Sequence, residues 1–183
     1  MPQPSKTERN DAPAPESSGQ GQEPTICYQA PGCLMALWHN VMIVVWSTRA
    51  TLSMVAELDK LIQSALAVAT NGKVSAINVA MNGSPLPEPD VRLAFDEITR
   101  RYGSHIVASY LVVGAGGFWA SELRSFVTGL QLVRDRKLRV HVATSLDEVA
   151  GLLPAVHLET GVRIEEAALR RVLQALTARA RAA

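Results

Sequence analysis

The stretch Ile106–Leu130 constrains the fold of this chain more than any other. An apolar run, Ile106–Val113, meets a glycine-rich turn, Gly114–Gly117, and a segment with helical periodicity follows at once. A buried strand that leads directly into a helix is the repeating unit of α/β domains. The stretch therefore predicts a parallel sheet with helices packed against it.

The segments on either side alternate in the same way. Two β-prone runs, Leu34–Trp38 and Val41–Ser47, are separated by His39-Asn40 and predict an antiparallel hairpin. After them, we expect strands at 74–81, 106–113 and 138–143, and helices at 51–70, 90–102, 118–137 and 165–180, with one more beginning at 145. This order predicts a single small α/β domain. Its sheet would be mostly parallel, with about four to five strands, an N-terminal antiparallel strand pair and helices packed on it.

Local signals mark several helix ends. Thr51 is a suitable N-cap for the first helix, and Asn71-Gly72 predicts its end. Ser145 and Glu148 have the spacing of a capping box, which predicts a helix start. Pro154 predicts that this helix is interrupted or restarts.

Composition divides the chain into three parts. Residues 1–26 are rich in proline and polar residues and poor in apolar ones, so we expect a disordered tail. Residues 27–160 would form the α/β domain, and residues 161–183 a C-terminal helix. The tail could carry a docking motif or serve as a plain linker.

Overall composition favours some classes of function over others. The 183 residues carry a net charge of +1, and aromatic residues make up 5%, so we expect no nucleic-acid binding. The longest apolar stretch, Leu34–Trp46, is too short to span a bilayer, and the N-terminus lacks the apolar core of a secretory signal. These patterns predict a cytoplasmic protein with no membrane span.

The residues capable of metal or redox chemistry are few and scattered. Cys27 and Cys33 are too few for a disulfide framework, and we expect two unpaired thiols. The histidines show no paired ligand spacing and have no partner nearby in sequence; they are His39, His105, His141 and His157. The sequence also lacks any familiar catalytic signature. We therefore predict no metal site, no cofactor and no catalytic residues.

The glycines of the central stretch admit more than one interpretation. Gly114, Gly116 and Gly117 follow a strand as in a dinucleotide-binding turn, but that turn belongs to the first βα unit and needs an acidic residue about 20 positions on. Here the turn lies late in the chain, and the next strand ends in Val142-Ala-Thr. A packing turn that requires small residues is the preferred interpretation. Weak contact with an anion or headgroup at the helix start stays open.

A second candidate region follows the middle strand. Asn82, Gly83 and Ser84 begin a loop at the edge where open α/β sheets usually place their sites. Phosphorylation of Ser84 would place charge near a positive helix end, although a plain loop serine is the simpler interpretation. Phe118 and Trp119 start the helix after the glycines, and we expect Trp119 in the core and Phe118 partly exposed.

The order of strands and helices resembles the STAS fold of anti-sigma-factor antagonists and sulfate-transporter tails, and most closely its SpoIIAA-like group. The segments that carry the resemblance are FWASELRSFV (residues 118–127) and VHVATSLDEVAGLL (residues 140–153). In the antagonists a phosphorylatable serine follows the middle strand, and Ser84 has that position here. The acidic residue and the serine pair of that turn are absent. The resemblance implies a non-catalytic domain that binds a partner along the loops after the strands.

Three functions follow, in order of preference. The first is a regulatory domain that contacts a protein partner through Asn82, Gly83, Ser84, Gly116, Gly117, Phe118 and Trp119. The second is a small-molecule or lipid-binding module that uses the same edge for an apolar or anionic ligand. The third is an enzyme with a Rossmann-like cofactor site. Assembly into a homodimer stays open.

Overall fold

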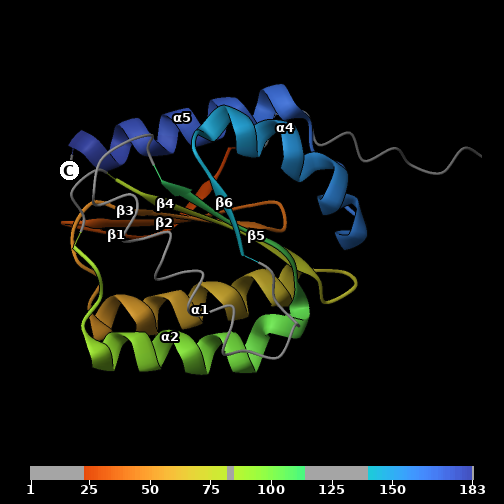
Figure 1. The fold of residues 1–183 in the computed structure, drawn as a ribbon. Coiled ribbons are helices and arrows are strands. Elements are labelled where there is room, and N and C mark those ends of the chain that lie inside the picture. The colour runs from red at the N-terminus through yellow and green to blue at the C-terminus, as the bar shows by residue number, and fades with distance from the viewer. Residues whose placement is uncertain (1–22, 82–84, 114–139, 183) are drawn as a thin grey trace, which may run out of the picture.

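The computed structural model describes residues 23–81, 85–113 and 140–182 (Figure 1). The described part of the chain is an α/β domain built on a six-stranded sheet. Its elements, in chain order, are β1 (Thr25–Ala30), β2 (Cys33–Trp38), β3 (Val41–Trp46), α1 (Leu52–Val68), β4 (Val74–Ala80), α2 (Pro89–Tyr102), the 3-10 helix η1 (Gly103–His105), β5 (Ile106–Val113), β6 (Val140–Ala143), α4 (Leu146–His157), the 3-10 helix η2 (Leu158–Thr160) and α5 (Glu166–Ala182).

The strands lie in the sheet in the order in which they occur in the chain, from β1 to β6. The first three strands pair antiparallel, whereas β3, β4, β5 and β6 are parallel. The predicted hairpin at His39-Asn40 is confirmed, and His39 adopts a positive φ of 51° in its turn. The α/β class and the mostly parallel sheet with an antiparallel N-terminal pair are thus confirmed.

The first strand, β1, was not expected, because the sequence analysis placed the first strand at Leu34. β1 begins at Thr25 and pairs with β2 across a turn at Pro31-Gly32. Gly32 has a φ of 89°, a conformation that favours glycine, and its carbonyl oxygen accepts hydrogen bonds from the amides of Ser47 and Thr48. The Pro-Gly pair was the available signal for this turn.

Two layers of helices cover the sheet, with α1 and α2 on one face and α4 and α5 on the other (Figure 1). β3 serves both layers because its side chains alternate between the faces. Val41, Ile43 and Val45 belong to the core under α4 and α5, and Met42, Val44 and Trp46 to the core under α1 and α2. All six are buried, as expected for a central strand of a sheet covered on both sides.

The C-terminal helix is part of the same core. Leu169, Leu173 and Leu176 of α5 are almost fully buried and pack with residues of the sheet and of α4. Arg179 Nε also donates a hydrogen bond to Gln29 Oε1 on β1 at 2.9 Å. Residues 166–182 therefore complete the domain and do not form an appended helix.

The predicted caps are present, but one predicted break is wrong. Thr51 and Ser145 are the N-caps of α1 and α4, and their side chains accept hydrogen bonds from the amides of Met54 and Glu148. Pro154 does not interrupt α4, which continues to His157. A proline inside a helix costs about 3 kcal/mol. The buried neighbours of Pro154 on the same helix offset this cost by packing in the core; they are Val149, Ala150 and Leu153.

Several predictions lie outside the described residues. These are most of the tail, the loop residues 82–84, and the glycine turn with the helix expected after it, residues 114–137. The strand expected at 138–143 is present from Val140 as β6.

Candidate functional site

The predicted partner edge follows the carboxyl ends of β4 and β5 in the sequence. The residues proposed for it lie outside the described residues; they are Asn82, Gly83, Ser84, Gly116, Gly117, Phe118 and Trp119. The strand ends that lead to them are described. Trp46 of β3, Ala80 of β4 and Val113 of β5 lie side by side in register. β4 and β5, the strands that precede residues 82 and 114 in the chain, are therefore neighbours in the sheet.

Two loops of this edge are joined to each other. The carboxyl rim, defined here as residues 47–51 and 85–88, contains an ion pair between Arg49 Nη1 and Glu88 Oε1. Both side chains are about half exposed. Arg92 Nε donates a hydrogen bond to the carbonyl oxygen of Pro87 at 2.7 Å, which fixes the second loop to α2. The rim is thus a connected surface that spans the ends of β3 and β4.

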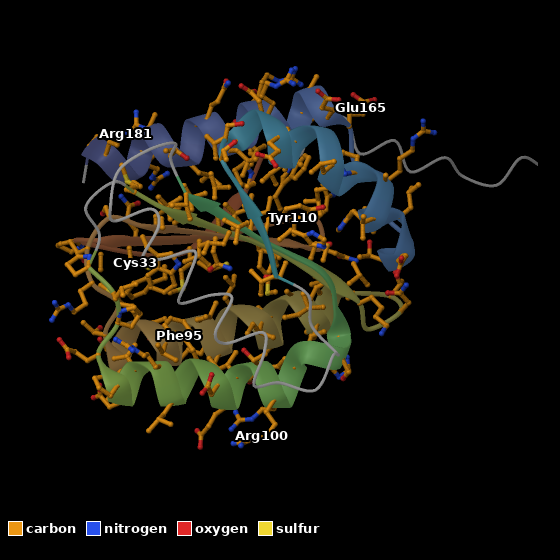
Figure 2. All side chains as sticks on the ribbon, viewed as in Figure 1. Cys33, Phe95, Arg100, Tyr110, Glu165 and Arg181 are labelled. Carbon is orange, nitrogen blue, oxygen red and sulfur yellow. The ribbon has the colours of Figure 1, made fainter. Side chains whose placement is uncertain are left out.

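Beneath the rim, polar and aromatic side chains meet on the α1/α2 side of the sheet. Trp46 Nε1 donates a hydrogen bond to Asn78 Oδ1 at 3.2 Å. The indole ring also contacts Phe95 edge-to-face, with ring centroids 5.9 Å apart. Figure 2 shows Phe95 on this side of the sheet. Asn78 is half-buried although β4 is a central strand, and an amide at that depth can orient a bound group.

The start of α4 supplies a carboxylate next to the same edge. Glu148 Oε2 accepts hydrogen bonds from the amide and the hydroxyl of Thr144, at 2.7 and 2.9 Å. These bonds lower the pKa of Glu148, because they stabilise its charged form. Glu148 therefore acts as a helix cap and is poorly suited to be a general acid near neutral pH.

A different cluster lies at the opposite end of the sheet. The amino-end network is defined here as Asn40, Ser75, His157 and Thr160. His157 Nδ1 lies 2.8 Å from Ser75 Oγ, and its Nε2 lies 3.3 Å from Thr160 Oγ1. The amide of Ser75 donates to the carbonyl oxygen of Asn40 at 2.9 Å. Ser75, His157 and Thr160 have no exposed surface.

His157 is held in its neutral form by its surroundings. Burial, and to a smaller extent the nearby charge of His39, lower its pKa from 6.5 to about 4. A neutral imidazole donates from one nitrogen and accepts at the other, so both hydroxyls can be satisfied at once. This cluster could not be predicted from local sequence, because Ser75 and His157 lie 82 residues apart.

The pair formed by Ser75 and His157 resembles a nucleophile with its base, but its environment argues against catalysis. Neither side chain is accessible, and the pair lies at the end of the sheet opposite the carboxyl rim. No carboxylate contacts the ring of His157 in the described ranges, so no third group orients it as in a catalytic triad. The network is suited to fastening elements together.

The contacts of the two cysteines, His105 and His141 are also described. Cys27 and Cys33 are both free, as expected, and burial raises the pKa of Cys33 to about 12, which keeps its thiol protonated. His105 Nδ1 lies 3.0 Å from the carbonyl oxygen of Gly72. His141 is exposed, and its ring stacks on the buried ring of Tyr110.

Residues 23–81, 85–113 and 140–182 contain no group of three or more potential metal ligands of the His, Cys, Asp and Glu types. Among the same residues, no helix combines the length and the apolar character needed to cross a membrane.

Comparison of the chain with known protein families and with curated proteins gives no match to a family model and none to a curated protein.

Proposed function

We propose that this chain is a non-catalytic, STAS-like regulatory domain that binds a protein partner through its carboxyl rim together with Phe118. The observation that carries the proposal is the link between Arg49 and Glu88, which joins the loops after β3 and β4 into one exposed surface. A surface whose parts are already held in place loses little conformational entropy when a partner binds. The sequential strand order and the N-terminal hairpin are compatible with the STAS resemblance.

The second candidate is a small-molecule or lipid-binding module at the same edge. Asn78 favours it, because this half-buried amide lies on a central strand beside Trp46 and Phe95. Among the described residues, the hydrogen bond from Trp46 engages the oxygen of the amide, and the NH₂ group of Asn78 would orient a ligand. A Rossmann-like cofactor enzyme has the least support. Such sheets bind cofactors where the strand order reverses, and the described strands follow one another without a reversal.

The proposal is tested by capturing partners from an extract of the source organism with the tagged full-length chain. The test variants are Arg49→Glu and Phe118→Ala. The matched control is Lys60→Glu, which breaks another exposed ion pair, with Glu57 on α1, outside the rim. We expect one protein to be retained by the wild type and by the control, and its affinity to fall about tenfold in each test variant.

Three outcomes would contradict the proposal. One is a partner that both test variants retain with unchanged affinity. Another is a co-purified small molecule seen by native mass spectrometry with no protein partner, which would favour the ligand-binding module. The third is a bound nucleotide absorbance in the purified chain, which would favour the cofactor enzyme. The double variant Arg49→Glu/Glu88→Arg restores the ion pair with reversed polarity. It therefore distinguishes a loss of affinity caused by displaced loops from one caused by the changed charge at each position.

A further inference from the structure

The amino-end network joins segments that are far apart in the sequence. His157 is the last residue of α4, Ser75 lies near the start of β4, and Thr160 lies in η2. Thr160 Oγ1 also accepts a hydrogen bond from the amide of Val162 at 3.3 Å. The imidazole of His157 therefore bridges the sheet and the connection between α4 and α5.

We propose that His157 is a pH-sensitive latch that holds η2 and the α4–α5 connection against the amino end of the sheet. The latch is closed when the ring is neutral and opens when the ring gains a proton. The released segment is residues 157–165, while the rest of the sheet and its two helix layers keep their places. This device is independent of the function proposed for the carboxyl rim.

The hydrogen bonds of the network explain why a proton opens it. In the neutral ring one nitrogen accepts a hydrogen bond from Ser75 or Thr160, and the other donates to the remaining hydroxyl. In the charged ring both nitrogens donate, so the hydroxyl that donated to the ring loses its acceptor. A buried donor without an acceptor costs about 1–3 kcal/mol. The buried positive charge adds a further cost.

The charged groups around the ring do not offset this cost. His39, in the turn between β2 and β3, acts on His157 in the direction that disfavours its charge. Lys73 on the approach to β4 directs its ammonium group to the carbonyl oxygen of Ser104. The charged side chains of η2 and of the connection to α5 are exposed; they belong to Glu159, Arg163 and Glu165.

The segment has a second, weaker anchor and a place to bend. Asn71 Nδ2 donates a hydrogen bond to the carbonyl oxygen of Glu159 at 2.9 Å, at an exposed position. Gly161 follows η2 with a φ of 79° and allows the chain to turn there. Because the contact of Asn71 is exposed to water, it is the weaker of these two hydrogen-bonded fastenings. Ile164, at the far end of the segment, is buried in the core.

The test is amide hydrogen exchange of the full-length chain at pH 7 and pH 5, with rates corrected for the intrinsic effect of pH. The pKa of the ring is about 4 when it is latched and 6.5 when it is released. This difference predicts that residues 157–165 lose about twentyfold in protection between pH 7 and pH 5. Buried amides of α1 should stay better protected than this segment at both pH values, because they exchange only when the whole domain unfolds. The variant His157→Gln keeps a hydrogen-bonding side chain but does not titrate, so its exchange should show no such dependence.

Two results would overturn the latch. One is equal protection of α1 and of residues 157–165 at pH 5, which would mean that the segment opens only when the whole domain unfolds. The other is unchanged protection of residues 157–165 at pH 5. If His157→Gln fails to fold, the wild type alone decides the question through the imidazole nitrogen shifts of His157 by NMR. A neutral ring at pH 5.5 supports the latch, and a half-protonated ring near pH 6.5 contradicts it.

Discussion

The two ends of the sheet both carry polar side chains and use them in opposite ways. At the amino end, the side chains of Ser75, His157 and Thr160 are fully buried and bond to one another. At the carboxyl end, Arg49 and Glu88 form an ion pair that is about half exposed. Buried polar groups stabilise a fold only while all of them are satisfied, whereas exposed ion pairs contribute little to stability. The amino end is therefore suited to fixing the fold and the carboxyl end to meeting a partner.

The largest expected effect concerns pH. His157 has a pKa of about 4 in the folded chain and 6.5 when exposed, so the folded state binds fewer protons over this range. The corresponding stability is fully present above pH 6.5 and is lost as the pH falls toward 4. We expect the wild type to lose up to about 3 kcal/mol of unfolding free energy that the His157→Gln variant does not lose. Urea unfolding at pH 7 and pH 4 measures this difference; parallel curves for the two proteins would refute it.

The next largest effect on stability is expected when Ser75, a hydrogen-bond partner of His157, is replaced. Ser75→Ala leaves Nδ1 of a fully buried ring without its hydrogen bond. We expect a loss of about 1–3 kcal/mol of unfolding free energy at pH 7.5, measured by urea denaturation. Ser53→Ala, at an exposed position of α1, is the matched control. A change no larger than that of the control would show that the amino end is not tied by this network.

A smaller effect on stability is expected at the carboxyl rim. Arg49→Ala removes the ion pair with Glu88. Because both side chains are about half exposed, we expect a change in unfolding free energy of about 0–1 kcal/mol, even though the partner affinity falls. Thermal denaturation combined with a binding assay separates the two quantities. A large loss of stability would mean that the rim is a structural feature and would weaken the comparison.

The smallest effect on stability is expected for Ser84→Asp, which imitates phosphorylation. The start of α2 already carries two carboxylates, since Glu88 is its N-cap and Asp90 lies in its first turn. We expect an unfolding free energy within about 0.5 kcal/mol of the wild type and a lower affinity for the partner. Isothermal titration with the captured partner measures the affinity. An unchanged value would remove the phosphorylation hypothesis.

Much of the fold follows from local signals in the sequence. The helix from Leu52 and the strand from Val74 were predicted from apolar periodicity, and the start of α4 from the spacing of Ser145 and Glu148. β1 was missed because its side chains alternate between exposed and half-buried, which gives an edge strand a weak apolar pattern. The break predicted at Pro154 was wrong because tertiary packing stabilises α4. The helix-breaking tendency of proline, taken from the sequence alone, does not include that packing.

The amino-end network could not be predicted, because it depends on a contact between residues 82 positions apart. Nothing near His157 in the sequence distinguishes it from His105 or His141. Its burial arises only when α4 packs against the sheet and brings its last residue over the start of β4. The carboxyl edge was predictable as a location, since parallel strands end together there. The link between Arg49 and Glu88 was not, because it joins two separate loops.

Hydrogen exchange of the complex with the captured partner, measured at pH 7.5, tests the division between the two ends most directly. The account predicts that partner binding increases protection in residues 47–51 and 85–92, at the carboxyl rim and the start of α2. It also predicts unchanged protection in residues 71–76 and 157–162, at the amino end. Protection that increases at the amino end while the rim stays unchanged would contradict the account.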